Sequence, residues 1–271
     1  MPDRYAVFGN PISHSKSPLI HAAFARQTAA NMQYEALLAP VHEFAAAVDA
    51  FRASGGVGAN VTVPFKQEAY RYATELTARA RFAQAVNTFK FDGEKVLGDN
   101  TDGAGLVHDI QHNLGFIISG KQVLLLGAGG AARGVLLPLL ACQPRALTIA
   151  NRTPHKAHEL AQHFAAHGVV NASDYLSLTG KRYDLVINAT SSSLNDELPP
   201  LPSQLFAPGA LAYDLMYGRG LTPFLAFAQR NQAQSWADGL GMLVEQAAEA
   251  FYVWRGVRPA TRPVIEMFQQ A

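Results

Sequence analysis

A glycine-rich loop offers the clearest binding chemistry in the sequence. Residues 123–126 predict an apolar strand, and the segment Gly-Ala-Gly-Gly-Ala-Ala-Arg follows from Gly127 onward. In this pattern Gly127 permits a tight turn, Gly129 lets the backbone approach a pyrophosphate, and Ala132 allows close packing of the next helix. A helix beginning near Gly130 would direct free N–H groups and its positive dipole end at the phosphates. The predicted dinucleotide site includes Gly127, Ala128, Gly129, Gly130 and Ala131.

The end of the next predicted strand, residues 147–150, bears on the choice of dinucleotide. An acidic residue there would bind a free ribose 2′-hydroxyl, whereas basic residues would accept a 2′-phosphate. The sequence has Asn151, Arg152 and Thr153 at this point, with Lys156 close behind and no carboxylate at the tip. Arginine and lysine can pair with a dianionic phosphate through charge-assisted bonds. NADP is therefore favoured over NAD, the alternative being that Arg152 is only a solvated loop residue.

Small polar residues gather beside predicted strand ends in the first half of the chain. They occupy residues 10–18, 60–66, 86–88 and 98–103, which read NPISHSKSP, NVTVPFK, VNT and GDNTDG. Such side chains bind ligands or cap loops. Loop capping is plausible for Ser13 and Thr88, but it explains the full set poorly.

Short strands alternate with longer amphipathic stretches, which is typical of βαβ units with parallel strands. Strands are predicted over residues 5–8, 34–38, 58–63, 123–126, 147–150, 185–188 and 211–214, with a hairpin of 87–91 and 95–97 turning at Asp92-Gly93. Helices are predicted after a Ser17 cap with Pro18 in the first position, and over 41–53, 75–82, 103–114 and 240–255.

These elements predict an α/β fold with two domains. Residues 1–102 and 239–271 would form an N-terminal α/β substrate and catalytic domain with a mostly parallel sheet, to which the C-terminal helices return. Residues 103–238 would form a Rossmann-type, doubly wound NADP-binding domain. The boundary is placed near Asp102 because the polar loops end there and the nucleotide unit starts soon afterwards.

Composition excludes several classes of protein. The 271 residues are 49% hydrophobic and 16% charged, which predicts a globular chain. A net charge of +1 predicts no excess of positive charge that would bind nucleic acid or an anionic membrane. The single cysteine, Cys142, and the lack of a long apolar run predict a cytoplasmic protein. Nine scattered histidines, among them His14 and His21, form no ligand set, so no metal is predicted. A monomer and a homodimer fit the sequence equally well.

The polar segments closely resemble those of the shikimate dehydrogenase family. The similarity continues through the glycine loop and through residues 188–190, 213–217 and 238–247, in one order over essentially the whole chain. The resemblance implies reversible NADPH-dependent reduction of the 3-keto group of 3-dehydroshikimate to shikimate, a step of aromatic amino acid biosynthesis. It places this reaction in a cleft between the two domains.

The resemblance also assigns the site residues. Substrate binding falls on Ser15, Ser17, Asn60, Thr62, Asn87, Asp102, Tyr217 and Gln246, with Ser15 and Ser17 holding the carboxylate. Beyond the glycine loop, cofactor binding falls on Asn151, Arg152, Thr153, Lys156, Thr190, Leu215, Gly239 and Met242. Buried polar partners of this kind discriminate strongly, because an analogue lacking one hydroxyl leaves a site group unpaired.

Lys66 is the expected catalytic acid and base. It follows a predicted strand and a proline, and a desolvated lysine can exchange protons near neutral pH. As hydride reaches the ketone carbon, an ammonium group would stabilise the growing charge on oxygen and donate the proton. Asp102 would orient Lys66 and the reacting hydroxyl. The alternative is a surface lysine and a helix-capping aspartate.

Three positions depart from the family pattern. Leu215 stands where a methionine often lies against the nicotinamide, Ala78 where some members carry an acidic residue, and Lys156 where arginine is frequent. Two other functions stay open. One is a quinate/shikimate dehydrogenase that uses NAD, and the other is a catalytically inactive homologue that binds NADP as a sensor.

Overall fold

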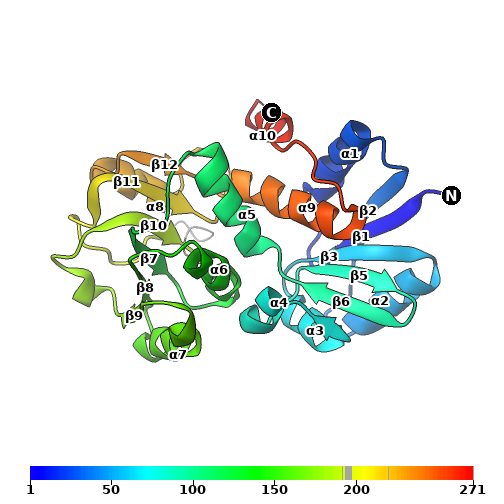
Figure 1. Cartoon of the computed structure of the whole chain (residues 1–271), viewed down its shortest axis with the longest axis horizontal. Coiled ribbons are helices and arrows are strands. Elements are labelled where there is room, and N and C mark those ends of the chain that lie inside the picture. Colours follow the sequence, from blue (N-terminus) through cyan, green and yellow to red (C-terminus); the bar gives the residue numbers. More distant parts are fainter. Residues whose placement is uncertain (191, 193–196, 219, 271) are drawn as a thin grey trace. The chain divides into compact units, whose positions relative to one another are not determined.

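A computed structural model of the chain describes residues 1–190, 192, 197–218 and 220–270. The chain divides into two compact units (Figure 1). Unit 1 comprises Met1–Gly105 and Leu243–Ala271, and unit 2 comprises Leu106–Met242. The predicted two-domain α/β architecture is therefore confirmed, and each unit is described by itself.

The sheet of unit 1 has the strand order β2-β1-β3-β5-β6-β4. Its strands are β1 (Asp3–Gly9), β2 (Met32–Leu38), β3 (Gly56–Val61), β4 (Glu75–Leu76), β5 (Thr88–Asp92) and β6 (Lys95–Asp99). β1 pairs in parallel with β2 and β3, and β4 pairs in parallel with β6. β5 is antiparallel to β3 and β6, and the predicted hairpin is confirmed because Asp92 pairs with Lys95 across a turn in which Gly93 has a φ of 58°.

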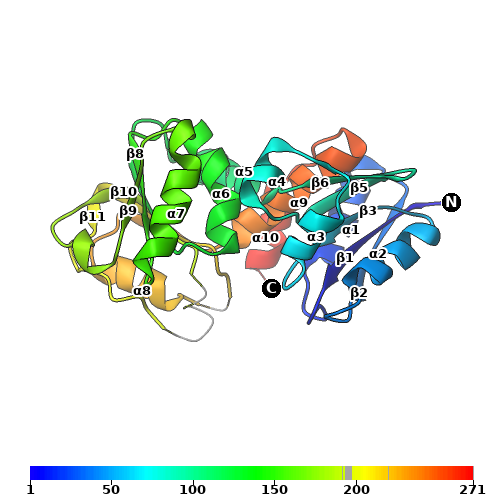
Figure 2. The same cartoon turned by 90° about the horizontal axis from the view of Figure 1, so that it is seen from below.

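Helices cover both faces of this sheet (Figures 1 and 2). They are α1 (Ser17–Thr28), α2 (Phe44–Ala53), α3 (Lys66–Tyr72), α4 (Ala78–Ala83), α9 (Leu240–Arg255) and α10 (Arg262–Gln269). On one face Phe8 packs against Phe44 and Phe65, which belong to α2 and the start of α3. On the other face Phe24 packs against Phe251, which brings α9 and α10 back onto α1 as predicted.

Unit 2 contains a parallel sheet of order β12-β11-β10-β7-β8-β9. Its strands are β7 (Gln122–Leu126), β8 (Ala146–Ala150), β9 (Val170–Ser173), β10 (Tyr183–Asn188), β11 (Phe206–Asp214) and β12 (Ser235–Ala237). In chain order this is the 3-2-1-4-5-6 arrangement of a doubly wound dinucleotide-binding sheet. The predicted Rossmann-type fold is confirmed.

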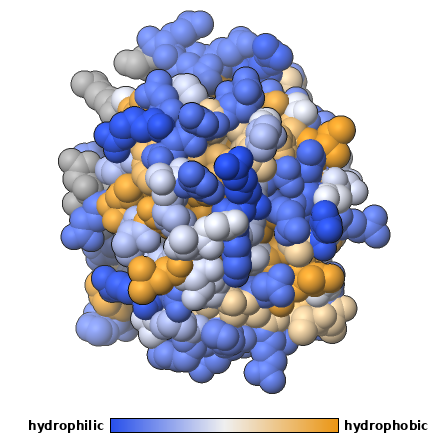
Figure 3. Space-filling model, turned by 90° about the vertical axis from the view of Figure 1, so that its left-hand side faces the viewer, coloured by the Kyte–Doolittle hydropathy of each residue, from blue (hydrophilic) through white to orange (hydrophobic). Residues whose placement is uncertain are grey.

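The helices of unit 2 lie on both faces of its sheet (Figure 1). They are α6 (Gly130–Ala141), α7 (Pro154–Phe164) and α8 (Pro223–Arg230), and α5 (Asp102–His108) leads into the unit and continues as a π-helical turn, Asp109–Asn113. β7 and β8 are almost entirely buried, which explains why apolar runs mark them in the sequence. Figure 3 views one side of unit 2, where hydrophilic residues form most of the surface and hydrophobic ones are interspersed.

The structure corrects several predicted elements. Lys16, not Ser17, is the N-cap residue of α1, and Ser17 is the first helical residue. The helix predicted over 75–82 begins only after Thr77, whose hydroxyl accepts a hydrogen bond from the Ala80 amide. Glu75 and Leu76 instead pair with β6, so a tertiary contact overrides the helical pattern. α3, β9 and β12 were not predicted because they are short and bury few side chains. In the described part of the chain, no helix is long and apolar enough to cross a membrane.

Candidate active site

A lysine–aspartate pair lies at the centre of the polar residues of unit 1. Lys66 is the first residue of α3 and Asp102 the first residue of α5. The Lys66 Nζ donates to Asp102 Oδ2 at 2.5 Å. The Asp102 side chain is 13% exposed and that of Lys66 is 31% exposed. The ammonium group therefore combines a fixed position with access to a ligand.

Asn87 holds the other oxygen of Asp102. Its Nδ2 donates to Asp102 Oδ1 at 2.7 Å and to Thr101 Oγ1 at 3.0 Å, with the Gln246 Oε1 at 3.4 Å. Its Oδ1 accepts from the Thr101 amide at 2.8 Å. A carboxylate only accepts and a backbone N–H only donates, so these partners fix which way the Asn87 amide points. The two oxygens of Asp102 are thus divided between Asn87 and Lys66.

A partly buried ion-pair network fixes the segment that carries Asp102. Arg79 binds both oxygens of Asp99, at 2.7 and 2.6 Å, and reaches Glu249 on α9 at 2.9 Å. Burial by itself would raise the pKa of Asp99, but hydrogen bonds and charge from Arg79 outweigh it and hold that pKa below its ordinary value. The Asp102 amide donates a hydrogen bond to Asn100 Oδ1 at 3.2 Å. The loop before α5 is therefore anchored to β6, α4 and α9.

The remaining predicted substrate residues are divided between the units. Asn60 lies near the end of β3, and its amide is within hydrogen-bond distance of Thr88. The Ser17 amide donates to the Ser15 hydroxyl at 3.3 Å, so these two residues are neighbours at the start of α1. Thr62 directly follows β3 and Gln246 lies on α9 in unit 1. Tyr217 belongs to unit 2, where it lies exposed after β11.

Thr101 and Thr88 belong to the same network although neither was predicted as a site residue. Both are fully buried, and Thr88 Oγ1 donates to Asn87 Oδ1 at 2.9 Å. Thr101 Oγ1 lies 3.1 Å from the same oxygen. Both residues lie in the polar segments 86–88 and 98–103, which was the available signal. Threonine is so common in loop caps that residue type alone could not separate a site residue from a capping residue.

In unit 2 the glycine loop leaves room for a phosphate. Gly127 has a φ of 105°, and a Cβ there would lie 3.0 Å from the Ala189 carbonyl oxygen, so this turn requires glycine. At Gly129 and Gly130 a Cβ would meet nothing within 4 Å. Space is therefore open beside the first turn of α6, where the free N–H groups of the helix lie. This cradle fits the pyrophosphate of a dinucleotide.

The loop after β8 carries the predicted 2′-phosphate residues. Arg152 and Lys156 are exposed, and Thr153 is the N-cap residue of α7. Asn151 braces the turn because its Nδ2 donates to the Thr153 carbonyl oxygen at 3.0 Å. Two cations beside a helix N-terminus suit an anionic group. Residues 151–153, which join β8 to α7, include no carboxylate.

Leu215, Gly239 and Met242 come together at the carboxyl end of β11. The Leu215 amide donates to the Asn188 carbonyl oxygen at 2.9 Å, and the Gly239 amide donates to that of Met216 at 3.1 Å. The Met242 amide donates to the Tyr213 hydroxyl at 3.2 Å. Thr190 lies one loop away, bonded to Asn188 Oδ1 at 2.7 Å. Apolar side chains and backbone groups of these residues form a surface at the edge of the sheet where a dinucleotide is bound in this fold.

Substitution of Gly239 by alanine should disturb this surface. The new Cβ would lie 2.2 Å from the Leu215 carbonyl oxygen, so the backbone must move. We expect the variant to lose about 1–3 kcal/mol of stability and to show a several-fold higher KM for NADP, measured by thermal unfolding and initial rates. Gly218→Ala is the matched control, because a Cβ there meets nothing within 4 Å. Equal behaviour of the two variants would show that the Gly239 contact is unimportant.

Comparison with known proteins places this geometry in context. Three family models match successive parts of the chain: shikimate dehydrogenase substrate binding domain over residues 7–89, shikimate / quinate 5-dehydrogenase over 110–195, and shikimate 5′-dehydrogenase C-terminal domain over 239–266.

Similarity to individual proteins extends over the full chain. A shikimate dehydrogenase (NADP(+)) of Nitrosospira multiformis is 59% identical over 271 residues, covering 100% of this chain and 98% of that protein. One of Dechloromonas aromatica is 62% identical over 265 residues, covering 98% and 97%. The crystal structure of a shikimate 5-dehydrogenase from Thermus thermophilus in complex with NADP(H) and shikimate has a TM-score of 0.88 at 30% identity, covering 99% of both chains.

Proposed function

This chain belongs to the shikimate dehydrogenase family, and from that premise we propose that it reversibly reduces 3-dehydroshikimate to shikimate with NADPH. The observation that carries the proposal is the Lys66–Asp102 pair at 2.5 Å, held in place by Asn87. A ketone reduction needs a proton donor beside the carbonyl oxygen, and this pair supplies one within a set of hydroxyl and amide groups.

Lys66 acts on the reacting oxygen. In the reduction, its ammonium group donates a hydrogen bond to the ketone oxygen, stabilises the charge that develops there and transfers the proton. In the oxidation of shikimate, the neutral amine takes the proton back. One N–H of the ammonium already bonds Asp102 Oδ2, so the other two are available for this work.

Asp102 and Asn87 set the position of the lysine. The carboxylate aims the Nζ and accepts from it, while the Asn87 amide prevents the carboxylate from rotating. Asp102 would also accept a hydrogen bond from a substrate hydroxyl beside the reacting carbon. The bond to Asp102 keeps the positive charge of Lys66 next to the oxygen whose negative charge grows during the reduction.

The substrate is a carboxylate with several hydroxyls, and the polar groups of unit 1 match that chemistry. Ser15 and Ser17 would bind the carboxylate, and Asn60, Thr62, Asn87 and Gln246 would bind the hydroxyls. Bound NADPH supplies the hydride. Gly127, Gly129 and Gly130 would hold its pyrophosphate, and Arg152, Thr153 and Lys156 its 2′-phosphate.

The absorbance of the reduced nicotinamide tests the function directly. Purified protein would be assayed with shikimate and with quinate, each with NADP and with NAD. We expect the highest kcat/KM for shikimate with NADP. A higher value for quinate or for NAD would support a quinate/shikimate dehydrogenase instead. Binding of NADP without turnover of either acid would indicate a sensor.

A further inference from the structure

Tyr34, which lies on the edge strand β2, contacts Asn60, one of the predicted substrate-binding residues. Its hydroxyl donates to Asn60 Oδ1 at 2.7 Å. Burial raises the pKa of the Tyr34 hydroxyl well above its ordinary value and outweighs the nearby Ser17 side chain, which lowers it. The hydroxyl therefore keeps its proton at neutral pH and can donate to Asn60.

The other partners of Asn60 determine which way its amide faces. Its Nδ2 lies 3.2 Å from the Asn87 carbonyl oxygen and 3.0 Å from Thr88 Oγ1. A backbone carbonyl can only accept, and the Thr88 hydroxyl proton is directed at Asn87 Oδ1. Both N–H groups of Asn60 are thus used inside the protein, and Tyr34 occupies one lone pair of Oδ1. One acceptor position on Oδ1 remains for a ligand.

An aromatic stack holds the Tyr34 ring. The His21 ring lies 4.2 Å from it at an interplanar angle of 14°, and the Trp254 ring lies 5.2 Å from His21. His21 is fully buried, neither of its ring nitrogens has a hydrogen-bond partner among the described residues, and burial lowers its pKa to about 3. The imidazole is therefore neutral, and stacking is the contact through which it acts on Tyr34.

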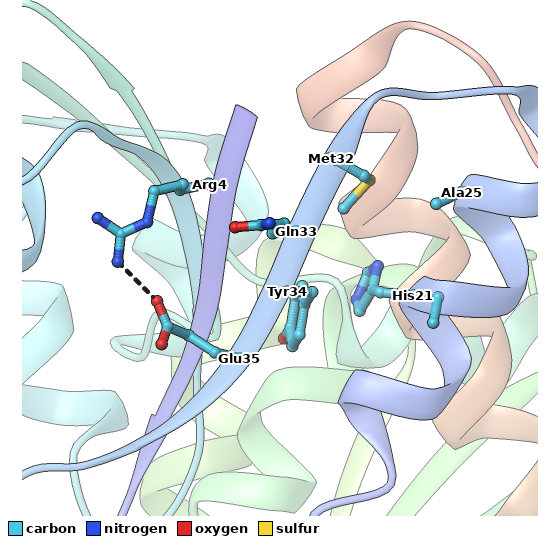
Figure 4. A pocket seen from close by; sticks show the side chains of 8 residues that line it. Arg4, His21, Ala25, Met32, Gln33, Tyr34 and Glu35 are labelled. Carbon is cyan, nitrogen blue, oxygen red and sulfur yellow. Dashed lines mark hydrogen bonds and ion pairs between the residues drawn. The ribbon is translucent and has the colours of Figure 1, made fainter. Parts of the chain in front are cut away.

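A pocket of about 620 Å³ borders Tyr34 at the edge of the sheet (Figure 4). Arg4, Gln33 and Glu35 contribute to its wall, and Arg4 pairs with Glu35 at 2.9 Å. The Tyr34 side chain also packs against the buried cluster of Tyr5, Ala250 and Trp254. The position of Tyr34 therefore depends on this packing, on the His21 ring and on the hydrogen bond of its own hydroxyl.

We propose that Tyr34 is a positioning residue for the substrate: its hydroxyl holds the Asn60 amide with its oxygen available to a substrate hydroxyl. The group that meets Asn60 must be a hydrogen-bond donor. A ketone cannot donate, so Asn60 serves a hydroxyl that is present in both substrate and product, whereas Lys66 serves the oxygen that changes. This inference rests on the proposed function and adds a specificity rule to it.

Tyr34→Phe removes only the hydroxyl and tests the proposal. We expect KM for shikimate to rise roughly tenfold, because Asn60 loses the hydrogen bond that positions it. Asn60 acts on a hydroxyl that shikimate and 3-dehydroshikimate share. KM for 3-dehydroshikimate, measured in the direction of reduction, should therefore rise by the same factor. KM for NADP and kcat should stay within twofold of the wild-type values.

Tyr72→Phe is the matched control. Tyr72 also lies in unit 1 and donates to Asp49 at 2.5 Å, but it has no contact with Asn60 or Ser17 among the described hydrogen bonds. Thermal unfolding of both variants reports any general loss of stability. An unchanged KM in Tyr34→Phe, a change in one reaction direction only, or an equal change in Tyr72→Phe would overturn the proposal. Lack of wild-type activity on shikimate would instead overturn the proposed function.

Discussion

Replacement of Lys66 by alanine should lower kcat for the reduction of 3-dehydroshikimate by about 10²–10⁴-fold, the range that a positioned general acid–base contributes. The variant loses the proton donor and also the positive charge beside the oxygen that becomes negative. The Asp102 carboxylate keeps its hydrogen bond from the Asn87 amide, so the surrounding network is retained. Steady-state rates in both directions, followed by nicotinamide absorbance, measure the effect.

Binding of NADP to the Lys66→Ala variant should be nearly unchanged, because the glycine loop and Arg152 belong to unit 2. A fluorescence titration measures this. Lys95→Ala provides the control, since Lys95 is also in unit 1 and forms an ion pair with Glu75 at 2.9 Å, but its side chain is 70% exposed. Exposed pairs of this kind contribute little. A Lys66→Ala enzyme with a kcat within threefold of the wild-type value would refute the catalytic role.

Replacement of Arg152 by alanine should lower kcat/KM for NADPH by roughly 10- to 100-fold, which corresponds to the loss of one charge-assisted contact to a phosphate. The same variant should use NADH about as well as the wild type, because NADH has no 2′-phosphate. The ratio of the two kcat/KM values isolates the contribution of the guanidinium from general damage to the protein.

Arg145→Ala is the control for charge. Arg145 is exposed and directly precedes β8, whereas Arg152 lies beyond the other end of that strand, so the two variants differ in position and not in net charge. We expect Arg145→Ala to keep the wild-type cofactor ratio. If Arg152→Ala kept it as well, Arg152 would be a solvated loop residue, and Lys156 and Thr153 would become the candidates for binding the 2′-phosphate.

Local order along the chain made the cofactor half of the site predictable. β7, the glycine turn and α6 follow one another without interruption, and β8 leads directly to Arg152. Each of these features is set by neighbours in sequence: buried strands need apolar runs, and the positive φ of Gly127 needs a residue without a Cβ. The long helix α9 was also predictable, because sixteen residues, Leu240–Arg255, provide enough turns for a clear pattern.

Short elements were harder to predict. β4 is two residues long and is defined by its pairing with β6. β9 and β12 lie at the edges of the sheet in unit 2, where few side chains are buried and the apolar pattern fades. α3 has only seven residues, too few for helical periodicity to stand out.

The sequence by itself determined the α/β class, the dinucleotide loop and the residue types of the polar site. Only the tertiary structure decided how those residues are connected: Lys66 and Asp102 are 36 positions apart, and Asn87 lies 159 positions from Gln246. It also decided that Tyr34, on an edge strand with no motif of its own, contacts Asn60. The physical reason is that hydrogen-bond partners are assigned by distances of about 3 Å, and strand order and helix packing, not sequence separation, bring these atoms within that range.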